Sequence, residues 1–262
     1  RVYSTLGNPN VLGQYIIFVL PIAFSVLFTK IREWHRFANL AVNALMFLCL
    51  ILTWSRGAWL GVLLAVGFFI LRHDKFWLAL CIIAVLIVPT ILPAEIIERL
   101  FSVGNVSDSS TAYRIAIWIS GARMAANSLP HGIGVGSHAF MVAYPEFMLS
   151  GADFALHSHN FYFQWLVDMG IPGLISFILI IFTAFRQVVT AGNKSKFMRI
   201  VILGMGCALI GWMFQGIAEN LWYNNRMLLF FWMYMGLLTS GAYISRGEDA
   251  PVLDIVTEVA GK

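Results

Sequence analysis

The residues with the clearest chemical potential are two histidines and an asparagine in the segment ALHSHNFYFQW, residues 155–165. His157 and His159 flank a serine, and Asn160 precedes a run of aromatic side chains. A neutral imidazole, with an ordinary pKa of about 6.5, can remove a proton from a hydroxyl group at neutral pH. The two histidines could equally bind a metal ion, or form only local hydrogen bonds between two helices. All three interpretations are open at this point.

A metal site needs three or four ligands. Additional side chains of a suitable type in the same region are His131, His138, Glu146 and Asp153. No motif spacing unites them with His157 and His159, in contrast to zinc motifs with their fixed ligand spacing. We therefore predict that the chain binds no metal ion and needs no other cofactor.

Two arginines occur in settings that suit phosphate binding. Arg56 lies in the segment TWSRGAWLG between two apolar stretches, and Arg114 lies in the first turn of a helix expected over 112–127. The planar guanidinium group binds phosphate or carboxylate through two parallel hydrogen bonds, and it stays charged when partly desolvated. The alternative is an arginine whose side chain only extends from a helix end to the membrane interface, or is solvated on a helix surface.

The elements that must position these residues are membrane helices. Of the 262 residues, 60% are hydrophobic and 11% are charged, whereas a soluble domain carries roughly 25% charged residues. Apolar stretches long enough to span a bilayer cover residues 11–29, 37–54, 57–71, 76–92, 171–189, 200–218 and 227–244. We therefore predict an all-α, polytopic membrane protein with about seven transmembrane helices, organised as a single domain over residues 1–262.

The distribution of lysine and arginine between the loops predicts the orientation. The loops after the first, third and fifth spans are rich in both residue types, which places them in the cytoplasm. The opposite side then holds the large insert over 93–170, between the fourth and fifth spans. All five lysines fall in the cytoplasm, and the basic residues outside are arginines only: Arg1, Arg56, Arg99, Arg114, Arg123 and Arg226. Because the span centres hold almost no ionisable residues, we expect the chemistry at the outer membrane surface.

The outer insert is predicted to contain short helices. LPAEIIERLFSV, residues 92–103, has the pattern of an amphipathic helix that lies on the membrane surface. A second helix over 112–127 can be capped by the preceding Asp, Ser or Thr residues, and it is expected to stop at Leu129–Pro130.

The rest of the insert contains turns with specific chemistry. PHGIGVGSHAF, residues 130–140, lacks the spacing of a nucleotide-binding loop, so its glycines are expected to let the backbone approach a neighbouring helix or a ligand. Ser158 or Asn160 can cap a helix that begins near Phe161. Gly170 would end that helix, and Pro172 can open the fifth span.

One further group of polar residues lies in the turn AENLWYNNRM between the last two spans. It contains Glu219, Asn220 and Arg226. We favour an interfacial ion pair within this turn over a catalytic role.

Four segments occur in a characteristic order along the chain. They are STLGNPNVLGQYIIFVLP at 4–21, LTWSRGAWLG at 52–61, YRIAIWISGARMAANSLPHGIGVGSHAF at 113–140 and HSHNFYFQWLVDMGIPGL at 157–174. Together, with the large outer loop between spans, they resemble the O-antigen ligase/polymerase superfamily of bacterial membrane proteins. The resemblance covers about residues 4–190, whereas the last two spans match only in being hydrophobic.

The resemblance implies a metal-independent glycosyltransferase in the bacterial cytoplasmic membrane, with an extracytoplasmic active site. Its donor would be a saccharide on a polyprenyl (undecaprenyl) diphosphate, used in the synthesis of O-antigen or another cell-envelope polysaccharide. Ligase members pass the glycan to lipid A–core, whereas polymerase members extend a chain. The expected partners are therefore the donor, a glycan or lipid-linked acceptor and membrane lipids, with no nucleic acid.

Onto this chain the resemblance maps His159 as the general base, with His157 as the second candidate. Arg56 and Arg114 would bind the diphosphate. Asn160 is expected to be a further substrate-binding residue, which orients the turn that carries the histidines. Attack by the acceptor on the face of the sugar opposite the leaving group predicts inversion at the anomeric carbon.

Two further expectations follow from the length and the composition of the chain. Family members have more spans than the seven predicted here, and the chain begins with Arg1, so we expect a piece of a longer protein that lacks N-terminal helices. The alternative function is a transporter or flippase of lipid-linked saccharides. That function requires a polar path across the bilayer, and the predicted spans have almost no charge near their centres.

Overall fold

The computed structural model describes residues 2–73, 87, 93–102 and 108–248, and all regular structure in these residues is helical. The helices long and apolar enough to cross a membrane are α1 (Pro9–Val26), α2 (Glu33–Thr53), α3 (Arg56–His73), α8 (Phe161–Val189), α9 (Lys196–Gln215) and α10 (Asn225–Arg246). They correspond to six of the seven predicted spans; the predicted span over 76–92 falls, apart from residue 87, outside the described residues. The protein is thus a polytopic, all-α membrane protein, as its composition predicts.

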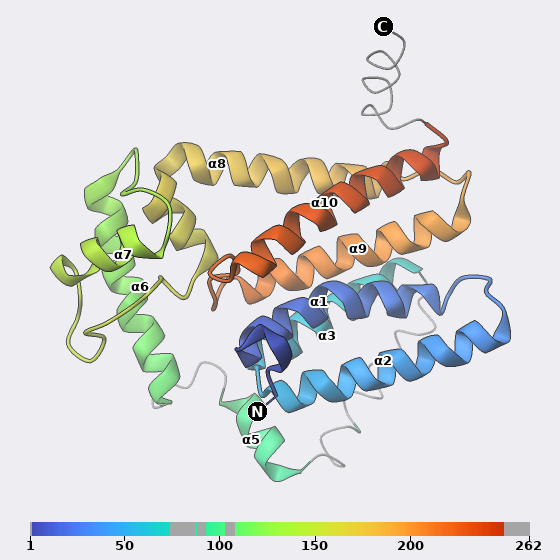
Figure 1. Cartoon of the computed structure of the whole chain (residues 1–262), viewed down its shortest axis with the longest axis horizontal. Helices are drawn as coiled ribbons and strands as arrows, with labels where there is room; N and C mark the ends of the chain where they lie inside the picture. The colour runs from blue at the N-terminus through green and yellow to red at the C-terminus, as the bar shows by residue number, and fades with distance from the viewer. Residues whose placement is uncertain (1, 74–86, 88–92, 103–107, 249–262) are drawn as a thin grey trace, which may run out of the picture.

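Helix α9 is the central helix of the bundle. It packs against α1 and α3 on one side and against α10 and α8 on the other. Figure 1 shows α2 at one edge of the bundle and α8 at the other. Both edge helices expose large apolar side chains, among them Phe37 and Leu45 on α2 and Ile178 and Phe182 on α8. Such side chains are suited to contact with lipid tails.

Glycines set the close approach of α3 and α9. A Cβ atom added to Gly61 would lie 2.8 Å from the carbonyl oxygen of Gly211, and one added to Gly211 would overlap the carbonyl oxygen of Gly61. Membrane helices commonly associate through small residues of this kind, because close backbone contact gives them van der Waals energy that burial from water does not supply.

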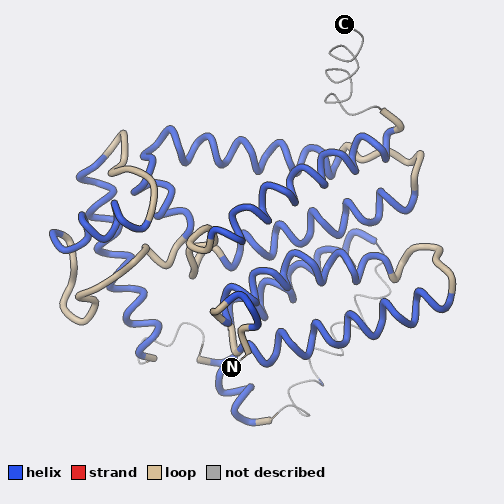
Figure 2. Tube along the Cα trace, in the orientation of Figure 1, coloured by secondary structure: helices blue, strands red, loops and turns tan. Residues whose placement is uncertain are grey.

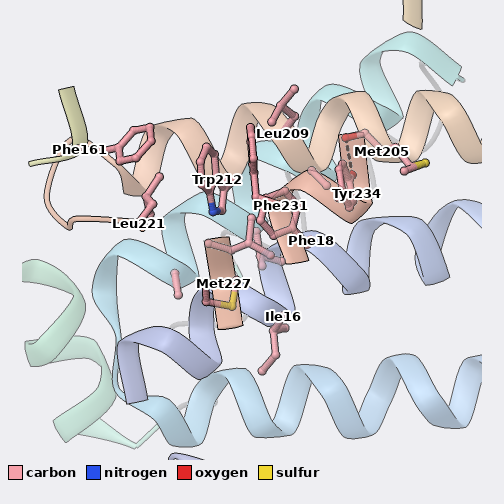
Figure 3. Packing of buried hydrophobic residues seen from close by; sticks show 14 of the residues in the cluster. Ile16, Phe18, Phe161, Met205, Leu209, Trp212, Leu221, Met227, Phe231 and Tyr234 are labelled. Atoms are coloured by element: carbon pink, nitrogen blue, oxygen red, sulfur yellow. Dashed lines mark hydrogen bonds between the residues drawn. The ribbon is translucent and has the colours of Figure 1, made fainter. Parts of the chain in front are cut away.

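Aromatic side chains pack the end of the histidine segment against the bundle. Phe161, which follows the segment directly, is 1% exposed, and its ring centroid lies 5.3 Å from that of Trp212 on α9. Trp212 stacks on Phe231 of α10 at 4.9 Å. Figure 3 shows these side chains in one continuous core with Phe18 of α1. The position of the histidines relative to α9 and α10 is therefore defined by buried contacts.

The insert between α3 and α8 contains α5 (Ala94–Phe101), α6 (Ser109–Ser128), α7 (Ser137–Ala143) and the 3₁₀ helix η2 (Tyr144–Glu146). Helices α6, α7 and η2 form a helical lobe beside one end of the bundle, whereas α5 lies apart from them, near α2 (Figure 1). Figures 1 and 2 show α6 and α7 beside the first turns of α8, away from the far end of the bundle. The lobe has its own buried core, centred on Ile117, Met124, Phe140 and Tyr144. The structure confirms the predicted helices over 92–103 and 112–127, and the Asp108 side chain caps α6 by accepting from the Thr111 amide.

The glycine-rich loop after α6 joins the lobe to α8 through backbone contacts. The Ile133 amide donates to the Val167 carbonyl at 2.8 Å, and the Ile171 amide donates to the Pro130 carbonyl at 3.0 Å. Gly170 has a φ of +65°, and any Cβ there would overlap the Pro130 carbonyl. The predicted close backbone approach and the predicted helix break at Gly170 are both confirmed.

The two ends of the bundle differ in their polar residues. At one end the Asn10 side chain of α1 reaches Glu219, and the Phe161 amide at the start of α8 donates to the Gly216 carbonyl after α9. At the other end the amide of Gly192 donates to the hydroxyl of Ser245. Lys30, Lys194 and Lys196, the lysines among the described residues, all lie at this second end.

Candidate functional site

Glu219, in the turn between α9 and α10, is the residue at which the predicted site residues meet. Its Oε1 lies 3.1 Å from Nδ1 of His159, and its Oε2 lies 3.4 Å from Nη2 of Arg114. The same Oε2 accepts a hydrogen bond from the Asn10 side chain at 2.8 Å. These four residues come from α1, α6, the loop before α8 and the turn after α9.

The predicted partner of Glu219 was wrong. The sequence suggested an ion pair within its own turn, with Arg226, but Arg226 donates to the carbonyl of Thr5 at 2.5 Å. Helix α6 instead brings Arg114, 105 positions away in sequence, to the carboxylate. The available signal was indirect: the sequence analysis predicted Glu219 and Arg114 on the same side of the membrane.

Glu219 is charged at neutral pH. Burial alone would raise the pKa of its carboxyl group, but the hydrogen bond and the positive charge from His159, together with the charge of Arg114, outweigh burial and lower this pKa below its ordinary value. A charged carboxylate can only accept hydrogen bonds, so Nδ1 of His159 must carry the hydrogen between them. With the hydrogen on Nδ1, the second ring nitrogen, Nε2, can hold a lone pair that accepts a proton.

His157 is more buried than its neighbour and has a different protonation state. Burial, reinforced by the proximity of His159, lowers the pKa of His157 to about 4, so its ring is neutral at pH 7. Its Nδ1 accepts a hydrogen bond from the His159 amide at 3.2 Å, which places the hydrogen on Nε2. The ring lies between that of His159, at a centroid distance of 4.1 Å, and that of Tyr223, at 4.4 Å.

The backbone of the histidine segment is held by neighbouring polar groups. His159 has a φ of +48°, in the left-handed region that few residues other than glycine adopt, and its carbonyl accepts from Nε1 of Trp118. Asn160 caps α8 by accepting from the amides of Tyr162 and Phe163, both at 3.0 Å. Its Nδ2 donates to the carbonyl of Ile217 at 2.9 Å. The Asn160 amide thus joins the turn to the residues after α9.

Arg56 and Arg114 line one cavity of about 110 Å³ at this end of the bundle. Arg56 is the first residue of α3 and is 8% exposed. Its guanidinium donates to the carbonyl oxygen and the hydroxyl of Ser102, at 2.7 and 2.6 Å, and lies 3.4 Å from a carboxylate oxygen of Asp108. Glu219 also lines the cavity, and its carboxylate connects Arg114 to His159, which is not part of the cavity wall.

One wall of this cavity has an unsatisfied polar group. Gln215, the last residue of α9, is 2% exposed, and its side-chain oxygen has no hydrogen-bond partner among the described residues. A buried acceptor without a partner costs free energy, about 1–3 kcal/mol. A hydroxyl group that entered the cavity could recover this cost by donating to Gln215.

The cluster also contains possible metal ligands. His157, His159 and Glu219 offer ligand atoms within 4.8 Å of one another. The residues that the sequence suggested as additional ligands (His131, His138, Glu146 and Asp153) are exposed and do not belong to this group. The Arg114 guanidinium already faces the Glu219 carboxylate, and its charge would repel a cation bound there. The geometry therefore suits a proton-accepting histidine paired with a carboxylate better than it suits a metal site.

The chain is thus a multi-pass membrane protein with a polar cluster at one end of its helices. The family model described as O-antigen ligase matches residues 41–178, just over half of the chain. The chain therefore belongs to the O-antigen ligase family, as the sequence motifs indicated. A search among curated proteins finds no match. The matched region contains Arg56, Arg114 and both histidines but ends before Glu219.

Family membership defines the activity in outline. It implies an enzyme of the glycosyltransferase or ligase type that acts on lipid-linked glycans, in a multi-pass bacterial membrane protein.

Proposed function

We propose that this protein, as a single O-antigen ligase-like domain, transfers a saccharide from a polyprenyl diphosphate to an acceptor hydroxyl. The observation that carries the proposal is the contact of one charged carboxylate, Glu219, with both His159 and Arg114, beside a cavity that Arg56 shares. A proton acceptor and two phosphate-binding groups in one place are what this transfer requires.

The proposed location is the outer face of the cytoplasmic membrane. Lys30, Lys194 and Lys196 lie at the end of the bundle opposite the cluster. The positive-inside rule assigns that lysine-containing end to the cytoplasm. The cluster then faces outward, at the level where the diphosphate of a membrane-anchored donor would lie.

His159 acts as the general base in this proposal. Its free Nε2 accepts the proton of the acceptor hydroxyl while the oxygen attacks the anomeric carbon of the donor sugar. The bond from that carbon to the phosphate oxygen breaks, and the lipid diphosphate leaves with the electron pair. Glu219 holds the ring through Nδ1 and stabilises the imidazolium ion that forms. His157 is a weaker candidate, because its Nδ1 lone pair already accepts a hydrogen bond and its Nε2 carries the hydrogen.

Arg56 and Arg114 stabilise the leaving group. Negative charge develops on the diphosphate as the glycosidic bond breaks, and a guanidinium aimed at it can lower the barrier by about 3–4 kcal/mol. Both side chains already face a common cavity and are paired with carboxylates, which neutralise them in the absence of donor. The arginines supply the positive charge for which other enzymes use a metal ion. Attack from the face opposite the diphosphate inverts the anomeric carbon.

The test is replacement of His159 by Ala in cells whose surface polysaccharide depends on the full-length protein. We expect polymer to disappear and lipid-linked donor to accumulate on the outer face of the membrane. The matched control is His131→Ala, which removes an exposed histidine of the same lobe. Normal polymer from an accumulated His159→Ala protein would refute the base, and donor that accumulates on the inner face would indicate a flippase instead.

A further inference from the structure

A second cavity lies at the same end of the bundle and is not used by the proposed chemistry. It has a volume of about 460 Å³ and opens widely to the surface. One wall is formed by residues 5–7, at and after the 3₁₀ helix η1 (Ser4–Leu6), and the other by residues 223–226, at the start of α10. A volume of this size falls in the ordinary range of small-molecule sites, roughly 300–1,000 Å³.

This Tyr223 cavity, defined by residues 5–7 and 223–226, adjoins the histidines. Tyr223 contributes to its wall, and the ring of Tyr223 lies 4.4 Å from that of His157. His157 in turn contacts His159 at 4.1 Å. The Arg56–Arg114 cavity reaches His159 by a different route, through the carboxylate of Glu219. His159, the candidate base, is thus connected to the Tyr223 cavity through His157 and Tyr223, and to the other cavity through Glu219.

The side chains of the Tyr223 cavity are suited to sugar hydroxyls and to the apolar face of a sugar ring. Tyr223 is 40% exposed and offers an aromatic face beside a phenolic hydroxyl. Asn225 and Arg226 are exposed, and between them they offer amide donors, an amide acceptor and guanidinium donors. This mixture differs from the arginine–carboxylate pairs that line the other cavity.

The walls are held in place before any ligand binds. Arg226 donates from Nη1 to the carbonyl of Thr5, which ties the two walls together across the chain. The Asn224 side chain accepts from the Arg226 amide and caps α10. Gly7 has a φ of +73°, which turns the chain between η1 and α1. A preformed site of this kind loses little conformational entropy on binding.

We propose that the Tyr223 cavity is the subsite for the acceptor saccharide. This inference rests on the proposed function and assigns the acceptor to a cavity separate from the one that Arg56 and Arg114 line. Inversion requires the acceptor oxygen and the leaving group to lie on opposite faces of the donor sugar. The two cavities share no lining residue, and each is connected to His159 through a different neighbour, so donor and acceptor can occupy separate sites.

The experiment is photo-crosslinking with the purified full-length protein. The probe is a lipid-free oligosaccharide, released from the surface polysaccharide of the host and carrying a diazirine group. We expect crosslinks at residues 223–226, competition by the unlabelled oligosaccharide, and no competition by undecaprenyl diphosphate. Tyr223→Ala should weaken probe binding by about fivefold, since a favourable aromatic contact is lost. Tyr3→Ala removes an exposed tyrosine that does not line the cavity and serves as the matched control with near-normal binding.

Undecaprenyl diphosphate binding distinguishes failure of this inference from failure of the proposed function. Arg56→Ala should weaken binding of undecaprenyl diphosphate and leave the oligosaccharide crosslinks unchanged. Crosslinks that map to the Arg56–Arg114 cavity, or that are unaffected by Tyr223→Ala, would overturn the acceptor assignment alone. If Arg56→Ala leaves undecaprenyl diphosphate binding intact and His159→Ala leaves polymer synthesis intact, the proposed function itself is wrong.

Discussion

The apolar bundle and the polar cluster at its end are specified by different properties of their residues. In the bundle, Gly61 and Gly211 matter because nothing larger fits between α3 and α9. In the cluster, Glu219 and His159 matter because of a charge and a hydrogen position. The bundle should therefore be sensitive to added volume, whereas the cluster should be sensitive to isosteric changes that leave volume unchanged.

The largest effect is expected from Gly211→Val. The added methyl groups would collide with the Gly61 backbone, and separation of α3 from α9 would disrupt the centre of the bundle. Overpacking of this kind costs about 1–3 kcal/mol or more, so we expect little folded protein in the membrane fraction. Gly67→Ala is the matched control, since a Cβ on Gly67 of α3 meets no described atom within 4 Å. Equal yields of both variants would contradict the close-packing interpretation.

Glu219→Gln should have the next largest effect, on turnover rather than on folding. An amide in place of the carboxylate can donate to Nδ1 of His159, which moves the hydrogen of the ring to Nε2 and removes the base. Loss of a general base lowers rates by about 10²–10⁴-fold. Turnover is measured against Glu146→Gln, which changes an exposed carboxylate of the lobe. A near-normal rate with stable protein would show that His159 is not oriented through Glu219.

Arg56→Lys keeps the positive charge and removes the planar guanidinium group. Lysine cannot reproduce bidentate contact with a diphosphate, and loss of one donor at a developing charge lowers rates by about 10²–10³-fold. The matched control is Arg123→Lys, at an exposed position of α6. If both variants turn over donor equally well, the role of Arg56 is structural, through Ser102 and Asp108.

The last expected effect is a dependence of stability on pH, without loss of the folded protein at neutral pH. The pKa of His157 is about 4 in the folded protein and about 6.5 in the unfolded chain. At pH values between these two, the unfolded chain therefore binds more protons than the folded protein. Stability should therefore fall as pH decreases from about 6.5 to about 4. Loss of the Glu219 charge would continue this decrease at lower pH, because its folded pKa is also lowered.

His157→Phe preserves a ring between His159 and Tyr223 and cannot be protonated. The midpoint of thermal unfolding of this variant should vary less between pH 6.5 and 4 than that of the unchanged protein. Identical pH profiles would show that His157 is not buried in its neutral form.

Local sequence patterns predicted much of the fold. Six spans, a helix cap at Ser158 or Asn160 and the helix break at Gly170 were predicted because hydropathy, capping and backbone freedom act over a few neighbouring residues; the structure shows that Asn160 is the cap. The motifs also indicated the O-antigen ligase family and brought Arg56, Arg114 and the two histidines to attention.

The sequence by itself thus determined the membrane helices, their turns and most of the polar residues that gather at one end of the bundle. Only the tertiary structure decided their partners: Glu219 with Arg114, His159 and Asn10, and Arg56 with Ser102 and Asp108. These contacts join residues separated by 46 to 209 positions. No local pattern encodes such pairs, because they depend on which helices pack together and at what height their ends meet.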